Sequence, residues 1–373
     1  MSPTMFTTDL KPLLDYPLKL CAATTATTYV LSIITGNVSQ VDRVWTFLPT
    51  VYTAYWALLP LWPSYDNKGW RLLAPYVPEE ATYFARDFSP RALLMLGLSV
   101  LWTLRLSYNT WRRGLFSLND EDYRWAVLRA KLPTWLFQVI NLTFVAVIQN
   151  VLLLLIATPT LIAATHPTPL TPTDGVLAFA AVALLAWEFT ADNQQFAYHA
   201  WKHRAAVAYK ASAHWPGARL AWTADDAARG FCTRGLWAWS RHPNFFAEQS
   251  FWGVLNLIPL LSLSGDVDVP GRDSTFVDAL QSLVPLAPSL SLCLLFLSST
   301  RFTESISASK YPRGYAAYRA RVSMFVPVLT PVWGALLKLT GGKAEVEELV
   351  WGKGAREAEA GDNKTKAAKA IGI

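Results

Sequence analysis

The chain has 373 residues, of which only 16% are charged, and its formal net charge at pH 7 is +6. Roughly a quarter of the residues of a typical soluble domain are charged, so this composition, with its positive mean hydropathy, excludes an ordinary soluble enzyme and indicates a membrane protein. The 17 tryptophans and 14 tyrosines fit rings placed at bilayer interfaces. We expect a lipid bilayer and a hydrophobic small molecule as partners, and no nucleic acid.

Apolar runs of about 20 residues are long enough to cross a bilayer as helices. We place such runs at 14–35, 44–62, 91–110, 134–157, 174–191, 244–263 and 276–298. They predict an all-α polytopic bundle of about seven transmembrane helices. A further apolar stretch at 322–340 carries Pro327 and Pro331, and we interpret it as interfacial or re-entrant. Residues 1–340 are thus predicted to form a single membrane domain, followed by a flexible, charged cytosolic tail at 341–373.

The distribution of Lys and Arg orients the predicted spans, because these residues are retained on the cytosolic side. The connections 105–133 and 192–243 and the segment after residue 298 are rich in them, whereas 158–173 has none. Two spans separate each basic region from the next, so one orientation satisfies all three. The sequence therefore predicts that the basic loops and the C-terminus face the cytosol.

Three groups of polar residues fall at the predicted cytosolic ends of the last three spans. The groups are Glu188, Asp192, Gln195 and Lys202; Arg241, His242, Asn244 and Glu248; and Arg301, Glu304, Lys310, Tyr311, Tyr315 and Tyr318. Such a set could bind an anionic cofactor, with guanidinium groups for phosphates, carboxylates and amides for ribose and a carboxamide, and tyrosines for an aromatic ring. Arginines at span ends are also topology determinants, but that role does not explain the carboxylates at the same depth.

His199 and His203 have the i, i+4 spacing of two metal ligands on one helix face. The chain has only five histidines, too few for a membrane di-iron oxygenase, so we interpret the pair as surface histidines and predict no metal site.

Three ordered blocks resemble the steroid 5-alpha-reductase-like membrane proteins, and most closely the branch long carried as a domain of unknown function. The blocks are Leu104-Arg105 to Trp125; Gly235-Leu236-Trp237 with Ser240-Arg241-His242-Pro243-Asn244-Phe245-Phe246-Ala247-Glu248; and Thr303-Glu304 to Pro327. The resemblance covers roughly residues 90–330. The chain departs from the family pattern at Phe245, where a tyrosine is common, and at Ala247, where a glycine is common. It also has Gln195 where sterol-reductase relatives often have a lysine.

The resemblance implies a multi-helix membrane fold in the endoplasmic reticulum, in which NADPH enters from the cytosolic side and a hydride passes to an activated C=C bond of a lipid-like substrate. It implies that Arg241 and Asn244 contact the phosphates and the carboxamide region, and that Glu248 holds the ribose or nicotinamide. The pocket would be completed by Asp192, Arg301, Glu304, Lys310, Tyr315 and Tyr318.

Reduction of an enone also needs an acid that protonates the enolate, and the candidates are Tyr108, Tyr198 and Glu188. Two other readings stay open. One is a membrane methyltransferase that uses S-adenosylmethionine, since the isoprenylcysteine carboxyl methyltransferases also carry Arg-His-Pro and a nearby glutamate. The other is a family member that has lost turnover, which Phe245 and Ala247 make conceivable.

Overall fold

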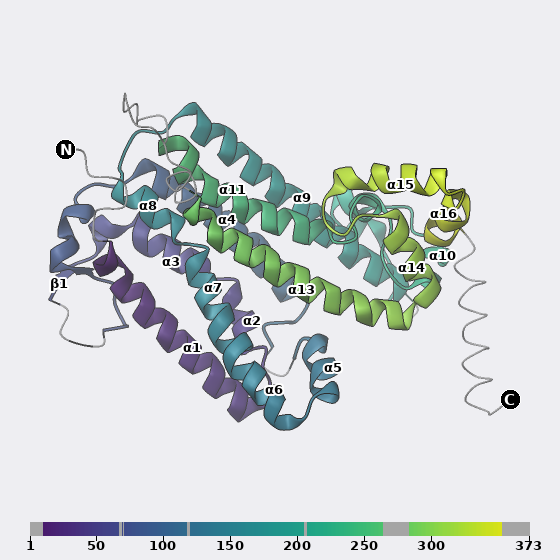
Figure 1. Cartoon of the computed structure of the whole chain (residues 1–373), viewed down its shortest axis with the longest axis horizontal. Helices are drawn as coiled ribbons and strands as arrows, with labels where there is room; N and C mark the ends of the chain where they lie inside the picture. Colours follow the sequence, from purple (N-terminus) through teal and green to yellow (C-terminus); the bar gives the residue numbers. More distant parts are fainter. Residues whose placement is uncertain are drawn as a thin grey trace. The chain divides into compact units, whose positions relative to one another are not determined.

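The computed structural model describes residues 10–66, 69, 71–117, 120–204, 207–263 and 283–352 (Figure 1). Most of these residues are helical, very few are in strands, and several of the helices are apolar and long, so the predicted all-α polytopic membrane fold is confirmed. The chain divides into two compact units, unit 1 with residues 1–182 and 251–293 and unit 2 with residues 183–250 and 294–373. The unit boundaries fall inside three helices, at 182/183 in α9, 250/251 in α11 and 293/294 in α13.

The described residues of unit 1 form the N-terminal helices and one short pair of parallel strands, in which Ser64 pairs with Val77. Its elements are η1 (Lys11–Leu14), α1 (Asp15–Thr35), α2 (Gln40–Trp45), α3 (Leu48–Ala57), η2 (Leu59–Leu61), β1 (Ser64–Tyr65), β2 (Val77–Pro78), η3 (Glu79–Ala85), α4 (Pro90–Arg112), α5 (Tyr123–Lys131), α6 (Thr134–Ile140), the π-helical η4 (Asn141–Ile148), α7 (Gln149–Leu155), α8 (Pro159–Thr165) and η9 (Val284–Leu286).

Unit 2 contains the C-terminal helices and the polar segments between them. Its elements, with the three helices shared between units, are α9 (Pro172–Lys202), η5 (Ala211–Ala213), η6 (Pro216–Ala218), α10 (Ala224–Arg229), η7 (Gly235–Ala238), α11 (Pro243–Leu263), α13 (Ala287–Lys310), α14 (Pro312–Arg321), η10 (Pro327–Leu329), α15 (Thr330–Leu339) and α16 (Lys343–Trp351).

Local sequence explains where several helices begin. The Ser89 hydroxyl oxygen accepts a hydrogen bond from the Ala92 N–H, and Pro90 occupies the first turn of α4, where its missing N–H costs nothing. In α10 the Thr223 hydroxyl and the Asp226 carboxylate each accept the other's backbone N–H, which forms a capping box.

A fully buried ion pair joins the beginnings of α4 and α9 within unit 1. The Arg91 Nε and Nη2 atoms donate to the two carboxylate oxygens of Asp174 at 2.8 and 3.0 Å. Neither side chain is more than 1% exposed, so each charge depends on the other for its compensation.

Five helical runs within the described residues are long and apolar enough to cross a membrane: Lys11–Thr35, Pro90–Arg112, Thr134–Thr165, Pro172–Lys202 and Val284–Lys310. They match five of the seven predicted spans, with the last one shifted toward the C-terminus. Residues 276–282 of that prediction lie outside the described residues.

The two remaining predicted spans have no counterpart among these five helices, for separate reasons. The segment 44–62 is not one long helix, because the chain breaks near Thr46 and Leu58 into α2, α3 and η2. The segment 244–263 does form one continuous helix, α11, but Glu248, Gln249 and Asn256 lower its mean hydropathy and it is not among the five.

Short helices form in the C-terminal part of the chain that the structure describes, and residues 353–373 of the predicted tail lie outside the described residues. The stretch 322–340 contains the short helices η10 and α15, which together are too short to cross a bilayer. Residues 343–351, inside the segment predicted as a flexible tail, form α16, where Val350 is fully buried. Figure 1 shows α14, α15 and α16 grouped together in unit 2.

Candidate functional site

The Arg241 guanidinium lies at the centre of a buried polar network in unit 2. Its Nε and Nη2 atoms donate to the two carboxylate oxygens of Glu304 on α13 at 2.7 and 3.1 Å. Its Nη1 atom donates to the backbone carbonyls of Arg319, at 3.2 Å, and Val322. Arg241 therefore holds α13 and the end of α14 together.

His242 contacts the same carboxylate. Its Nε2 atom lies 3.0 Å from Glu304 Oε1. Burial lowers the pKa of His242, and the neighbouring Glu304 carboxylate opposes that shift only in part. In the neutral imidazole, Nε2–H donates to Glu304. Arg241, His242 and Glu304, which were predicted to share a cofactor pocket, thus contact one another, and their part in cofactor binding stays a prediction.

Asn244 links α11 to α9. Its Nδ2 atom donates to Asp192 Oδ1 at 3.1 Å, whereas its side-chain oxygen, Oδ1, is buried and has no hydrogen-bond partner among the described residues. Glu188 and Glu248 lie one helical turn from Asp192 and Asn244 respectively, and both are buried. Three carboxylates and one amide thus lie on the facing turns of α9 and α11 in unit 2.

The residues that depart from the family pattern fit their surroundings. The Phe245 ring stacks on His242, with ring centroids 5.5 Å apart, and meets Phe296 edge to face at 4.9 Å. Ala247 is fully buried. Phe245 therefore makes aromatic contacts that do not need the hydroxyl of a tyrosine.

A second group of predicted residues gathers around Tyr311. The Lys202 Nζ atom donates to the Gly230 carbonyl at 2.8 Å and to the Tyr311 hydroxyl at 3.1 Å. The Lys310 ammonium lies 5.4 Å from the centre of the Tyr311 ring. Tyr315 and Tyr318 are buried, and burial raises the pKa of each phenol.

The other predicted residues are more dispersed. Arg301 is exposed on α13 and Gln195 is half-buried on α9. Of the three proton-donor candidates, Glu188 is buried on α9, and the buried Tyr198 hydroxyl donates to the Asp226 carbonyl at 3.0 Å. Tyr108 belongs to unit 1, where its exposed ring lies 5.2 Å from the Arg112 guanidinium.

His199 and His203 are exposed and their rings stack 6.2 Å apart. In the described part of the chain, no group of three or more His, Cys, Asp or Glu side chains is arranged to hold a metal ion.

The Asp226 carboxylate joins two arginines, and it is not among the site residues predicted from the sequence. It accepts hydrogen bonds from Arg229 Nη1 at 2.8 Å and Arg234 Nε at 2.7 Å. Arg229 also donates to the Gly352 carbonyl beyond α16. The capping pattern Thr223-Ala224-Asp225-Asp226 can be recognised in the sequence and indicates the start of a helix. The link to α16 could not be predicted, because α16 lies in the segment predicted as a flexible tail.

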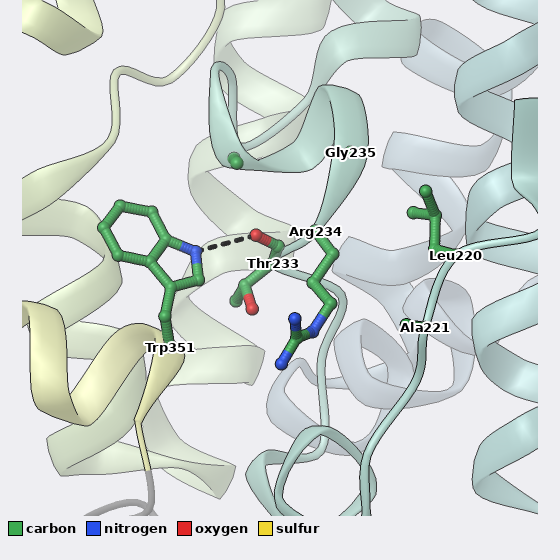
Figure 2. A pocket seen from close by; sticks show the side chains of 7 residues that line it. Leu220, Ala221, Thr233, Arg234, Gly235 and Trp351 are labelled. Carbon is green, nitrogen blue, oxygen red and sulfur yellow. Dashed lines mark hydrogen bonds between the residues drawn. The ribbon is translucent and has the colours of Figure 1, made fainter.

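Two neighbouring cavities lie in unit 2 and share Ala238 and Trp351. The first, of about 340 Å³, is lined by Leu220, Ala221, Thr233, Arg234, Gly235, Ala238 and Trp351. Figure 2 shows the Trp351 indole N–H donating to the Thr233 carbonyl, with Leu220 on the opposite side of the cavity. The second, of about 550 Å³, lies between η7, the end of α14, α15 and α16.

Comparisons with known proteins identify a family of similar sequences. A family model described as a protein of unknown function (DUF1295) matches residues 28–322. The chain is also similar to the uncharacterized protein C594.04c of the fission yeast Schizosaccharomyces pombe, with 30% identity over 303 residues that cover 80% of this chain and 75% of the relative. No solved structure matches the chain.

Proposed function

The chain belongs to the DUF1295 family, and from that premise we propose that it is a membrane-embedded, NADPH-dependent reductase that transfers a hydride to an activated C=C bond of a steroid- or lipid-like substrate. The proposal places the family with the steroid 5-alpha-reductase-like proteins and the chain in the endoplasmic reticulum membrane. It rests on the polar turns of α9 and α11.

The observation that carries the proposal is the unpartnered side-chain oxygen of Asn244. A buried acceptor without a partner costs about 1–3 kcal/mol, and such groups in native proteins are usually satisfied by water, an ion or a ligand. Asn244 is fixed by its bond to Asp192, so its Oδ1 atom is presented in one direction. The amide N–H₂ of a nicotinamide carboxamide is a donor of the kind that this oxygen can accept.

Under the proposal, other polar residues of unit 2 would supply the remaining contacts that a dinucleotide needs. Asp192 and Glu248 can accept from ribose hydroxyls. Lys202, Lys310 and Arg301 are cations on the same unit that can face phosphates. When bound, NADPH supplies a hydride, which is the proton and two electrons that its nicotinamide ring gives up on becoming NADP⁺.

The protein's own task is then to orient the substrate and to deliver one proton. Hydride addition to the β-carbon of a conjugated C=C–C=O group would move the π electrons toward the carbonyl oxygen, and an acid of the protein would then protonate the α-carbon of the enolate. Glu188 is our first choice for that acid, because it is buried beside Asp192 on α9, whereas the Tyr198 hydroxyl already donates to a backbone carbonyl.

The second candidate function is methyl transfer from S-adenosylmethionine, for which Arg241-His242-Pro243 and Glu248 are also suitable. A sulfonium cofactor has no phosphates, so the exposed cations Arg301 and Lys310 would lack a role in that case. A member of the family without turnover would keep the fold and bind neither cofactor productively.

Ligand binding by the purified full-length protein in detergent tests these readings. We expect NADPH to raise the melting temperature, and NADH and S-adenosylmethionine to do so much less, because binding to the folded state stabilises it. Stabilisation by S-adenosylmethionine alone would contradict the reductase proposal.

The matched variants are Asn244→Ala and Asn256→Ala. Both asparagines lie on α11, and both have a buried side-chain oxygen without a partner among the described residues. The Asn256 Nδ2 atom bonds only to the Trp252 carbonyl of its own helix. We expect Asn244→Ala to abolish the NADPH shift and Asn256→Ala to retain it; equal loss in both would show that Asn244 has no special part in cofactor binding.

A further inference from the structure

The larger of the two cavities described above combines an aromatic wall with a basic rim. Among its lining residues are Trp239 and Trp351, and the cations Arg321, Lys338 and Lys343. No carboxylate is among its described lining residues, and Glu347, which lies beside the lining, pairs with Arg321 at 2.8 Å and is 3.8 Å from Lys343 Nζ. Its volume of about 550 Å³ is within the range of small-molecule sites, roughly 300–1,000 Å³. The cavity is therefore suited to an anionic group.

Arg321 is held in a fixed position at this cavity. Its Nε atom donates to Glu347 Oε1 at 2.8 Å, its Nη1 atom donates to the Thr330 carbonyl at 3.1 Å, and the guanidinium lies 5.1 Å from the centre of the Trp351 ring. Within the described residues its Nη2 atom makes no hydrogen bond. A guanidinium fixed in this way keeps donors ready for an oxyanion.

A glycine on α15 makes this position possible. A Cβ atom at Gly334 would lie 2.9 Å from Arg321 Cζ, which is closer than real side-chain contacts allow. The helix backbone thus leaves room for the guanidinium because residue 334 has no side chain.

A separate exposed apolar surface lies along η10 and α15, mainly on a different side of α15 from the cavity-lining residues Pro331, Gly334, Ala335 and Lys338. Its large hydrophobic side chains are at least 38% exposed, and they are Val328, Leu329, Val332, Trp333, Leu336 and Leu339. Lys338 is on the same helix and Lys343 begins the next one. Apolar side chains with flanking lysines on a short helix are typical of segments that lie in the interface of an anionic bilayer.

We propose that this cavity binds the phosphate headgroup of an anionic phospholipid, whose acyl chains lie along the exposed apolar side chains of η10 and α15. Arg321 Nη2, Lys338 and Lys343 would face the phosphate oxygens, and Trp239 and Trp351 would contact the glycerol region. The proposal is independent of the reductase function, because it uses none of the residues assigned to NADPH.

Native mass spectrometry of the full-length protein in detergent, titrated with phosphatidylglycerol or phosphatidylcholine, tests the proposal. We expect phosphatidylglycerol to bind preferentially. The double variant Lys338→Gln/Lys343→Gln should weaken its binding about 25-fold, because each lysine near anionic lipid contributes about 5-fold.

The matched control is Lys210→Gln/Arg313→Gln, which removes the same charge from exposed positions of unit 2 that do not line the cavity. It should change binding less than about 2-fold if the cavity is specific. Equal weakening by both pairs would overturn the proposal, because it would reveal attraction by net charge alone.

A further variant separates geometry from charge. Gly334→Ala leaves the net charge unchanged but forces Arg321 to move, so it should also weaken phosphatidylglycerol binding; unaltered binding would remove Arg321 from the site. Two competitors identify other sources of phosphate. Displacement of the lipid by inorganic phosphate or by NADPH would overturn the lipid assignment, and we expect neither to displace it.

Discussion

At the scale of single residues, Arg241 differs most from what its motif suggests. A guanidinium has five N–H donors, and the four hydrogen bonds that Arg241 makes to Glu304, Arg319 and Val322 leave one. The sequence indicates a phosphate ligand, whereas the contacts describe a residue that also holds two helices together. A variant at this position therefore changes stability as well as any cofactor binding.

We predict that Arg241→Gln destabilises the folded protein by roughly 3–5 kcal/mol, because it leaves the buried Glu304 carboxylate without its main partner. Thermal or denaturant unfolding in detergent measures the change. Arg313→Gln, at an exposed position of α14, is the control and should change stability by less than about 0.5 kcal/mol. The double variant Arg241→Gln/Glu304→Gln should lose less than the sum of the single variants; strict additivity would contradict the pairing.

Asp226 gives a prediction about pH. Burial by itself raises the pKa of Asp226, but hydrogen bonds from Arg234, Thr223 and Arg229 outweigh it and lower the pKa below the ordinary value of 3.8. The folded state thus binds this proton more weakly than the unfolded state, and the stabilisation is present above pH 3.8 and is lost as the pH falls below it toward the folded-state pKa.

We therefore expect Asp226→Asn to lower the stability at neutral pH and to flatten the stability-against-pH curve below about pH 4. Unfolding of the two proteins at a series of pH values measures the difference between the curves. Parallel curves would show that the ion pairs of Asp226 with Arg229 and Arg234 contribute no pH-dependent stability.

At the scale of elements, the long apolar helices were predictable and the polar connections were not. The runs at 14–35 and 91–110 match α1 and α4 within two residues at each end, because length and hydropathy decide such segments. The run at 44–62 has the same apolar character, yet it folds as short buried helices. Burial by neighbouring helices, rather than by lipid, makes that difference, and composition cannot distinguish the two.

The polar clusters were likewise predictable only in part. The pairing of Asn244 with Asp192 and of Arg241 with Glu304 joins residues 52 and 63 positions apart, and the sequence predicted only that they share one end of the spans. It could not predict that α16 packs on α14, because nine residues of mixed composition within a charged tail carry too weak a helical signal.

The end of α10 offers a prediction about a helix terminus. Gly230 has φ of 88°, and a Cβ atom there would lie 2.2 Å from the Tyr311 ring. Gly36, at the end of α1, has φ of 65° and nothing within 4 Å of an added Cβ. Gly36→Ala should cost about 1–2 kcal/mol for the left-handed backbone alone, and Gly230→Ala should cost about 1–3 kcal/mol more because of the added overlap.

Unfolding of the two alanine variants under the same conditions measures that difference. The variant Gly230→Ala/Tyr311→Ala should recover the steric part relative to Tyr311→Ala alone. Equal costs for Gly36→Ala and Gly230→Ala would mean that Tyr311 moves away freely.

At the scale of the whole molecule, the membrane topology depends on α11. The basic regions 192–243 and 299–321 can both face the cytosol only if the chain crosses the bilayer twice between them. α13 provides one crossing, and α11 must provide the other. Its 21 residues span about 31 Å, which matches a hydrocarbon core of about 30 Å. The polar residues that lower its hydropathy include Asn244 and Glu248, which belong to the candidate site.

We predict that α11 crosses the membrane, and two introduced cysteines test this. Leu170→Cys lies in the connection without Lys or Arg, Arg313→Cys follows α13, and both positions are exposed. In sealed vesicles of known orientation, a membrane-impermeant maleimide should label Arg313→Cys from the cytosolic face and Leu170→Cys from the opposite face. Three crossings by α9, α11 and α13 separate the two positions. If α11 does not cross, only two crossings remain and both cysteines react from the same face. That result would also contradict a cytosolic location of the polar residues at the start of α11.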